Sequence, residues 1–203
     1  MRTQRLIAYA FALCLASLLA GLAMADDHPR NPSILKGTYR HMVSGSCATS
    51  DAVDASGAGF TPFPFLQAIG SGSTGPGGFT GVITYDGKGN ATETLHGIGL
   101  SDGPYGAGTF PVLTYEEICD WTYVVNRDFS FIRKGICHGT TTGGQFAGSP
   151  YTLSDIEWVG QIGIGGSVLI TNSVEPVEQK LSNGFLTKRI CASQGTEVRM
   201  LKQ

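Results

Sequence analysis

One segment constrains the fold more than any other, residues 119–137, which read CDWTYVVNRDFSFIRKGIC. If residues 127–129 form a three-residue loop, the flanking runs pair as antiparallel strands and Cys119 lies directly opposite Cys137. Two cysteines that face each other across such strands are close enough to bond, best at a pair that lacks backbone hydrogen bonds. The segment therefore predicts a β-hairpin that contains a Cys119–Cys137 disulfide.

The same register sorts the side chains of this hairpin into two faces. The apolar face carries Cys119, Trp121, Tyr123, Val125, Phe131 and Cys137, and the polar face carries Asp120, Thr122, Asn126, Ser130, Lys134 and His138. A shift of one residue would destroy both the sulfur pairing and this separation. The register also sets Trp121 against Gly135, which is a favourable pairing of an aromatic ring with a glycine.

The start of the chain predicts export. Arg2 and Arg5 precede an apolar run over residues 6–23, and Ala-Met-Ala at 23–25 is followed by acidic residues. This is the pattern of a secretory signal peptide. We therefore expect residues 1–25 to be a signal peptide, 26–33 a flexible leader and 34–203 a single domain, located in the periplasm or outside the cell.

The cysteine count agrees with this compartment. The chain has five cysteines, and only Cys14 lies within the expected signal peptide. Four remaining cysteines in an exported chain suggest two disulfides, so Cys47 is expected to pair with Cys191 once Cys119 and Cys137 have paired. Because no C-x-x-C spacing occurs, we expect no metal site.

Alternation of apolar and polar residues, interrupted by clusters drawn from 29 glycines, continues along the rest of the chain. This pattern is typical of an all-β protein. We expect strands at 34–45, 79–85, 91–98, 106–115, 119–126, 129–138, 152–162, 167–173, 185–192 and 196–201, and a helical turn at 177–181. Sequential hairpins predict an antiparallel up-and-down β-barrel of about 8–10 strands, with a β-sandwich as the alternative.

The segment DGKGN at 86–90 has the composition of either an ion-binding loop or a tight turn. A calcium loop needs more oxygen ligands at fixed spacing, and a phosphate loop needs a following helix. Here a single carboxylate is present and an alternating run follows. The segment therefore predicts a hairpin turn, for which glycine, aspartate and asparagine are the favoured residues.

Three ionisable residues fall on faces that are otherwise apolar. Arg133 is opposite Tyr123 and next to Phe131; His41 lies between Tyr39 and Val43; Glu93 shares a face with Leu95. A buried charge is costly unless it is paired, so together these groups could orient a polar ligand or move a proton. The alternative is that Arg133 extends past the end of its strand into solvent and that His41 is a satisfied core residue. The candidate ligand-binding residues are Tyr39, His41, Glu93, Trp121, Tyr123, Phe131 and Arg133.

Several functional classes receive no support from the sequence. The chain has 14 Lys and Arg against 16 Asp and Glu, with no basic stripe, so nucleic acid is not an expected partner. Neither G-x-S-x-G nor H-E-x-x-H occurs, and no cofactor or catalytic residue is indicated. Charges on the outer faces, such as Lys36 and Lys134, disfavour stable insertion in a membrane.

Four segments give the chain a wider resemblance: LKGTYRHMVSG, GVITYDGKGNAT, GTFPV followed by ICDWTYVV, and RICASQGTEVRM. Together they resemble uncharacterised exported bacterial proteins with lipocalin-like or allene-oxide-cyclase-like barrels. The resemblance implies a secreted, disulfide-bearing β-barrel and supplies no catalytic motif, because a fold does not define a function.

Three functions are consistent with these observations. The first is a periplasmic or secreted barrel whose partner is a small, largely apolar molecule held inside. The second is a cyclase or isomerase on the same barrel, with His41 or Glu93 as proton carrier. The third is a structural or surface-interaction protein whose barrel is filled by its own side chains, as small barrels often are.

Overall fold

The computed structural model describes residues 31–61, 67–70, 72–100, 112–144, 147–173, 179–182 and 186–201. The expected signal peptide lies outside these ranges. The strands are β1 (Gly37–Ser50), β2 (Gly72–Tyr85), β3 (Asn90–Leu100), β4 (Val112–Val125), β5 (Ser130–Gly143), β6 (Pro150–Ile162), β7 (Val168–Asn172), β8 (Gln179–Ser182) and β9 (Leu186–Arg199). Two short 3-10 helices, η1 (Pro32–Leu35) and η2 (Ile164–Gly166), complete the described elements.

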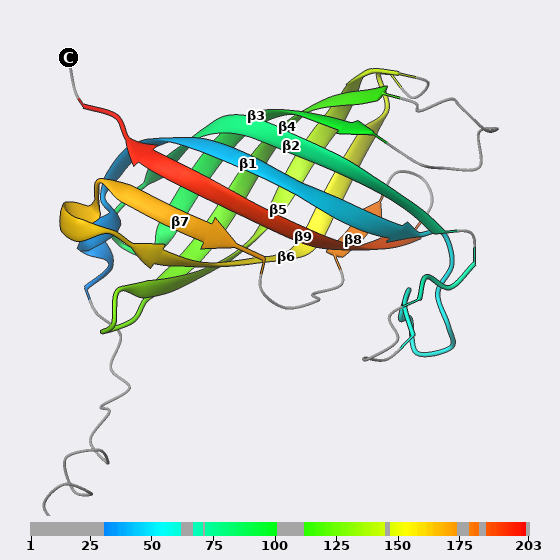
Figure 1. The fold of residues 1–203 in the computed structure, drawn as a ribbon, viewed down its shortest axis with the longest axis horizontal. Helices are drawn as coiled ribbons and strands as arrows, with labels where there is room; N and C mark the ends of the chain where they lie inside the picture. The colour runs from blue at the N-terminus through cyan, green and yellow to red at the C-terminus, as the bar shows by residue number, and fades with distance from the viewer. Residues whose placement is uncertain are drawn as a thin grey trace, which may run out of the picture.

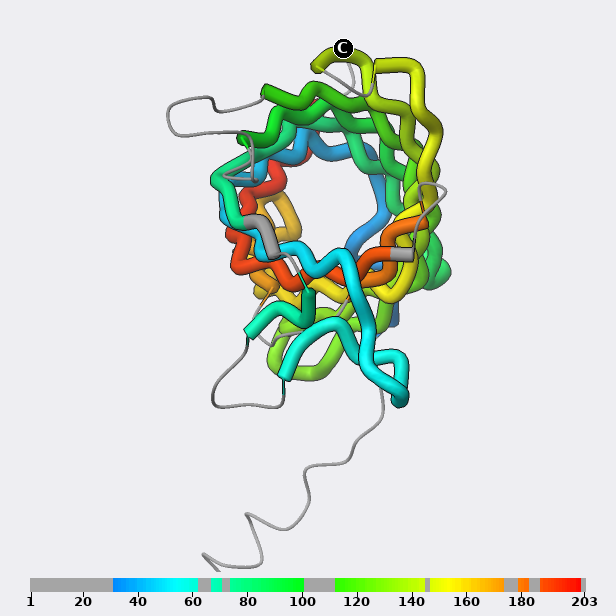
Figure 2. Tube along the Cα trace, turned by 90° about the vertical axis from the view of Figure 1, so that its right-hand side faces the viewer, coloured from blue at the N-terminus to red at the C-terminus, as the bar shows by residue number. Residues whose placement is uncertain are grey.

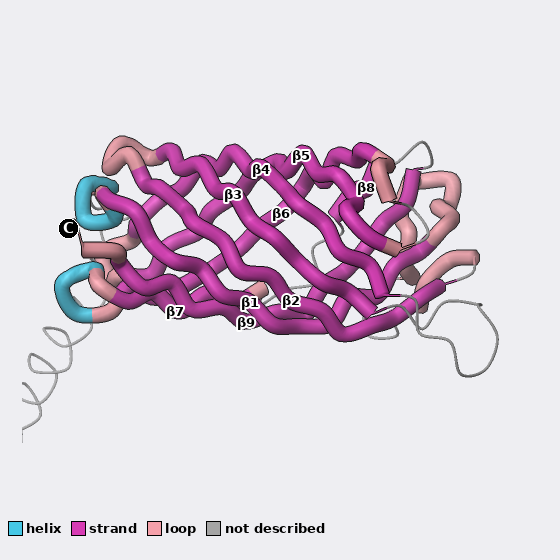
Figure 3. Tube along the Cα trace, turned by 90° about the horizontal axis from the view of Figure 1, so that it is seen from above, coloured by secondary structure: helices cyan, strands magenta, loops and turns pink. Residues whose placement is uncertain are grey.

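The strands form one closed antiparallel barrel with eight strand positions. Neighbours in sequence pair from β1 to β6, and β9 returns to pair with β1 and so closes the wall. Strands β7 and β8 both pair with β6 and with β9, one after the other, and so share a single position. The long tilted strands and their closure are visible from the side and along the barrel (Figures 1, 2 and 3). The up-and-down barrel expected from the alternation is confirmed.

The cysteine-flanked hairpin has the predicted register. Cys119 pairs with Cys137, Trp121 with Gly135 and Tyr123 with Arg133. Both expected disulfides are present, Cys119–Cys137 and Cys47–Cys191, the second joining β1 to β9 at the seam of the barrel. The DGKGN segment is the turn between β2 and β3, as predicted, and its Asp86 carboxylate accepts the backbone N–H groups of Lys88 and Asn90.

Several expected elements differ in the structure. The strand expected at 34–45 begins only at Gly37, because residues 32–35 form η1. The strands expected at 106–115 and 119–126 are one strand from Val112 onward, and those expected at 185–192 and 196–201 are likewise the single strand β9. In neither case does a turn separate the two expected strands, and Gly195 pairs with Thr171 in the ladder between β9 and β7. Residues 179–181, expected in a helical turn, belong to strand β8 because β6 and β9 offer them ladder partners on both sides.

One end of the barrel is closed by the chain itself. At this closed end η1 places Leu35 in the core, fully buried. The Tyr39 hydroxyl donates to the carbonyl of Gly166 at 2.7 Å, and the Tyr123 hydroxyl donates to the carbonyl of Pro32 at 3.1 Å. Figure 1 shows η1 and the turn that contains η2 side by side at this end. Pro32 and Ser33, expected in the leader, are thus part of the cap.

Aromatic rings cover inward-facing glycines along the barrel wall. Trp121 lies over Gly135, Tyr115 over Gly97, Tyr151 over Gly139 and Phe131 over Gly160, and in each pair a Cβ on the glycine would lie within 3.0 Å of the ring. Flat rings therefore fill a small barrel because the opposite position has no side chain. Among the described residues no helix is long and apolar enough to cross a membrane.

Candidate functional site

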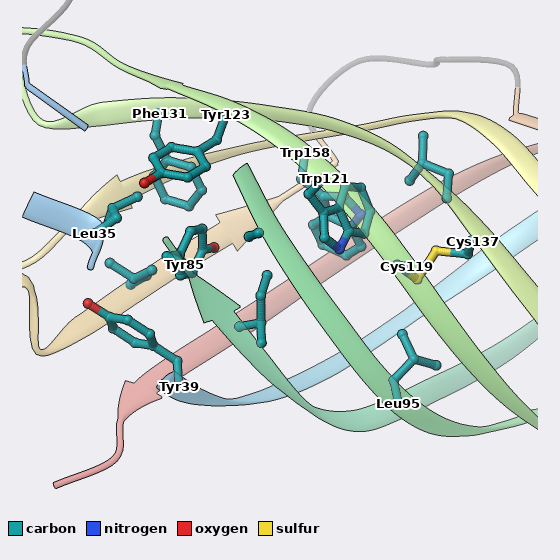
Figure 4. Close-up of a cluster of buried hydrophobic side chains, with 14 of the residues drawn as sticks. Leu35, Tyr39, Tyr85, Leu95, Cys119, Trp121, Tyr123, Phe131, Cys137 and Trp158 are labelled. Atoms are coloured by element: carbon teal, nitrogen blue, oxygen red, sulfur yellow. A yellow bond between two sulfur atoms is a disulfide. The ribbon is translucent and has the colours of Figure 1, made fainter. Parts of the chain in front are cut away.

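Eight inward-facing side chains, one from each strand position, form a buried cluster within the barrel. They are His41, Tyr85, Glu93, Trp121, Arg133, Trp158, Thr171 and Glu197, and we call them the polar cluster. Each is no more than 6% exposed. Figure 4 shows Trp121 and Trp158 between the aromatic group near Leu35 and the Cys119–Cys137 disulfide.

Arg133 is at the centre of the polar cluster. Its Nη1 donates to Glu197 Oε1 at 2.5 Å and to the Tyr85 hydroxyl at 2.9 Å. The guanidinium carbon lies 4.9 Å from the ring centroid of Trp121 and 5.5 Å from that of Trp158, so both indole rings are within cation–π distance of the charge. Burial lowers the pKa of Arg133, but the neighbouring carboxylates and Tyr85 outweigh burial and hold the pKa above its ordinary value. Arg133 is therefore a permanent cation.

His41 and Glu93 form a second pair. His41 Nδ1 lies 2.6 Å from Glu93 Oε1, and Trp121 Nε1 donates to Glu93 Oε2 at 3.0 Å. Burial raises the pKa of Glu93, but the hydrogen bond from His41 and the charge of Arg133 outweigh it, so the pKa lies below the ordinary value. Glu93 is thus ionised and holds the imidazole of His41 by its Nδ1 atom.

Four buried polar atoms of this cluster have no hydrogen-bond partner in the described part of the chain: His41 Nε2, Arg133 Nε, Arg133 Nη2 and Thr171 Oγ1. Two of them converge on Gly195, where a Cβ would lie 2.6 Å from Thr171 Oγ1 and 2.9 Å from His41 Nε2. Buried polar groups in folded proteins almost always have a partner, which is often a water molecule or a ligand. The cluster therefore has unused hydrogen-bonding capacity.

The structure brings four of the seven candidate ligand-binding residues together: His41, Glu93, Trp121 and Arg133. The other three, Tyr39, Tyr123 and Phe131, lie nearer the closed end, where they are at most 4% exposed and pack with Leu35 (Figure 4). Figure 4 shows them as part of the aromatic floor of the barrel.

Sequence reasoning missed four members that complete the cluster: Tyr85, Trp158, Thr171 and Glu197. Glu197 is the direct partner of Arg133, and the Tyr85 hydroxyl donates to Glu197 Oε2 at 2.9 Å. The sequence contained a signal for Glu197, because it lies two residues after Gly195 in an alternating run and therefore shares a face with that glycine. That run does not reveal which face is inward, because its partner β1 is distant in sequence and only the closed barrel fixes their register.

The end opposite the cap, which we call the open end, has an inner wall of small residues. Inward positions there on β9 and β1 to β3 are Gly45, Gly77, Gly97, Gly99 and Ser193. A Cβ on Gly99 would meet nothing within 4 Å. Below this wall lie Val43 and Phe79, both only partly buried, and the Phe79 ring centroid is 5.0 Å from that of His41. These small residues therefore line the inner wall between the open end and Val43 and Phe79, the side chains that separate this end from His41.

Glu117 is a further acid inside the barrel, beyond the disulfide. Its Oε1 accepts a hydrogen bond from the Tyr151 hydroxyl at 2.6 Å, whereas its Oε2 lies 3.9 Å from Cys119 Sγ. That sulfur is oxidised and bonded to Cys137, so it neither donates a proton nor offers a thiolate for a metal. Burial is the largest cause that raises the pKa of Glu117, although Arg189 and Tyr151 oppose it.

This raised pKa predicts a pH-dependent effect of Glu117→Gln. The folded state holds the carboxyl proton more tightly than the unfolded state, so stability falls as the pH rises from the ordinary value of 4.5 through the folded pKa. Above that window we expect Glu117→Gln to be more stable than the parent by about 1 kcal/mol, because no charge is buried. Below the window the two proteins should unfold at similar denaturant concentrations.

Denaturant titrations at several pH values measure this difference. The control is Glu116→Gln, whose side chain is 59% exposed on the outer face, and it should leave stability nearly unchanged at every pH. A Glu117→Gln protein that is less stable than the parent above the window would contradict the prediction.

A groove of about 600 Å³ crosses the outside of the barrel from β3 to β8. Most of its lining faces outward, including Thr94, Ile118, His138 and Thr152. His138 Nδ1 lies 3.2 Å from Thr152 Oγ1, so these polar groups already contact each other. The four unpartnered buried atoms lie inside the barrel, and we therefore place the candidate site there.

Comparison with models of protein families finds no match to this chain, and no curated protein matches its sequence.

Proposed function

We propose that this protein is an exported barrel that binds a small, largely apolar molecule in its interior, with a neutral hydrogen-bond acceptor such as a carbonyl directed at Arg133. The observation that carries the proposal is the free edge of the buried guanidinium. Nε and Nη2 point to the same side of the group and together form a two-pronged donor, which has no partner in the described residues. Two disulfides support an oxidising, exported location.

The charges of the polar cluster favour a neutral acceptor over an anion. Arg133 is already paired with Glu197, and Glu93 is a second carboxylate in the same cluster. A ligand carboxylate would add a third negative charge to a site of low dielectric, where like charges repel strongly. A carbonyl oxygen accepts the same two hydrogen bonds without that repulsion.

The walls around the cluster favour an apolar body. Phe79 and Val43 are partly exposed on the open-end side of the cluster, and the Trp158 ring lies 6.3 Å from that of Phe79 and 6.0 Å from that of His41, between centroids. Ligand pockets of this kind combine apolar and aromatic walls with a few convergent polar groups.

Three probes that share a benzene ring test the proposal: acetophenone with a neutral carbonyl, benzoate with a carboxylate, and ethylbenzene with no acceptor. Titration calorimetry gives the affinities, and quenching of Trp121 and Trp158 fluorescence reports occupancy of the interior. We expect acetophenone to bind at least about tenfold more tightly than either other probe, the value of one good polar contact. No saturable binding of acetophenone would instead favour a packed structural barrel. Equal affinity for all three probes would show that the free donors of Arg133 do not direct binding.

Two variants connect the affinity to the free donors. Arg133→Lys keeps the charge but loses the two-pronged edge, and we expect it to weaken acetophenone binding about tenfold. Arg40→Lys, exposed on the outer face of β1, is the matched control and should leave binding unchanged. Thr171→Val removes an unpartnered hydroxyl, so it should fold, and it should selectively weaken carbonyl probes if they contact this end of the cluster.

A further inference from the structure

Beyond binding, we propose that His41 is a proton acceptor for the bound molecule, so that the barrel catalyses isomerisation of a carbonyl compound by proton transfer. The proposal rests on the binding function above. It assigns a catalytic role to His41 and a positioning role to Glu93, and its substrate class is a ketone or aldehyde that carries a hydrogen on the carbon next to the carbonyl.

The imidazole of His41 has the arrangement of a general base. Glu93 accepts the Nδ1 proton at 2.6 Å, which leaves Nε2 as the basic nitrogen of the neutral ring. Nε2 has no hydrogen-bond partner in the described residues, and it faces Gly195 together with the side chain of Val43. Packing by Phe79 and Trp158, both edge-on to the ring, fixes its plane.

The surroundings also stabilise the charges that proton transfer creates. Glu197 Oε1 lies 3.8 Å from His41 Nε2, so an imidazolium would have a carboxylate on each side. The same oxygen is 2.5 Å from Arg133 Nη1, which places base and guanidinium on either side of one atom. The free edge of Arg133 would face the negative charge that develops on the carbonyl oxygen, as donors do in an oxyanion hole.

The reaction balances with these groups alone. His41 Nε2 takes a proton from the carbon next to the carbonyl, the C–H electron pair becomes a carbon–carbon double bond, and the carbonyl π pair moves to oxygen. Arg133 Nε and Nη2 donate to that enolate oxygen. In a β,γ-unsaturated ketone Nε2 then returns the proton to the γ carbon, the enolate collapses to the carbonyl, and the conjugated isomer leaves.

Allyl phenyl ketone is a suitable probe, because its conversion to the conjugated propenyl ketone changes the ultraviolet absorbance. We expect the protein to catalyse this conversion and His41→Gln to lower kcat/KM by about 10²–10⁴-fold, the usual contribution of a general base. Binding of acetophenone, measured in parallel, should stay within about threefold, since His41 contributes proton transfer more than affinity. His96→Gln, which alters an exposed histidine on β3, is the control and should change neither quantity.

The role of Glu93 is tested separately. Glu93→Gln cannot hold the Nδ1 proton of His41 with a charge, so kcat should fall while KM and acetophenone affinity change little. Imidazole ¹⁵N NMR of the parent protein should show the proton of the neutral ring on Nδ1, and the His41 Nε2 resonance should shift when acetophenone saturates the site. This measurement needs no variant, so it decides the question even if His41→Gln does not fold.

The outcomes separate the two proposals. Acetophenone binding without isomerisation, or an Nε2 resonance that acetophenone leaves unchanged, would overturn proton transfer and leave the binding function intact. Absence of acetophenone binding would overturn both. Isomerisation that survives in His41→Gln would show that another group is the base.

Discussion

Glu197→Gln is expected to destabilise the protein by about 3–5 kcal/mol, which is the cost of removing one partner from a buried ion pair. For a domain of this size the melting temperature should fall by roughly 10 °C. The substitution keeps the shape of the side chain but removes the carboxylate that lies 2.5 Å from Arg133 Nη1. Both side chains are fully buried, so water cannot replace the lost charge.

The size of this effect follows from the surroundings of Arg133. Its guanidinium lies within cation–π distance of Trp121 and Trp158, and an arginine side chain is not deprotonated in proteins, so the guanidinium stays charged when its partner is removed. Tyr85 would also lose the oxygen that accepts its hydroxyl proton. The destabilisation therefore comes from a buried cation that has lost its directly bonded carboxylate, together with an unpaired buried hydroxyl.

Two further proteins test this explanation. Glu157→Gln removes the partner of Lys134 from an ion pair of 2.8 Å between β6 and β5 on the outer face of the barrel. The side chain of Lys134 is 65% exposed there. An exposed pair of this kind should cost less than about 1 kcal/mol. The double variant Arg133→Met, Glu197→Gln should recover most of the stability lost in Glu197→Gln, because no charge remains unpaired at that position. A Glu197→Gln protein as stable as Glu157→Gln would contradict the prediction.

The parts of the fold that local pairing determines could be predicted from the sequence. The loop at residues 127–129 fixes the register of β4 with β5, so the disulfide Cys119–Cys137 and the position of Arg133 on the apolar face both followed from one hairpin. The full burial of Arg133 did not follow, since the hairpin alone does not show whether its guanidinium reaches solvent. Glu93 was placed in the same way by the turn at 86–90. In both hairpins a short turn and strict alternation leave one register that buries the apolar side chains.

The partners of these residues could not be predicted, because they come from strands that are distant in sequence. Glu197 meets Arg133 across the barrel from a position 64 residues away, and Tyr85 meets Glu197 from 112 residues away. No turn relates these strands, and only closure of β9 onto β1 fixes their relative height. The same limitation explains the two long strands that were expected as shorter pairs, since a continuous ladder depends on neighbours on both sides.

The seam between β1 and β9 gives the second large expected effect, in a protein that lacks Cys47 and Cys191. This disulfide joins residues 144 apart in sequence, whereas Cys119–Cys137 joins residues 18 apart. A cross-link over a longer loop removes more conformational entropy from the unfolded chain. We expect the double alanine variant at Cys47 and Cys191 to lose about 5 kcal/mol and that at Cys119 and Cys137 about 3 kcal/mol.

The solvent exposure of the two disulfides predicts which of them a reductant opens first. Cys119 and Cys137 are buried within the hairpin, whereas Cys47 and Cys191 are partly exposed at the seam. Attack by a thiolate requires access to the sulfur, so a mild reductant should open Cys47–Cys191 first, and peptide mapping of alkylated samples would identify it. The disulfide that contributes more stability is then also the one reduced first. Its reduction removes the covalent link between β1 and β9, the strand that carries Glu197. Equal destabilisation by the two double variants would show that native-state strain or residual structure outweighs the chain entropy.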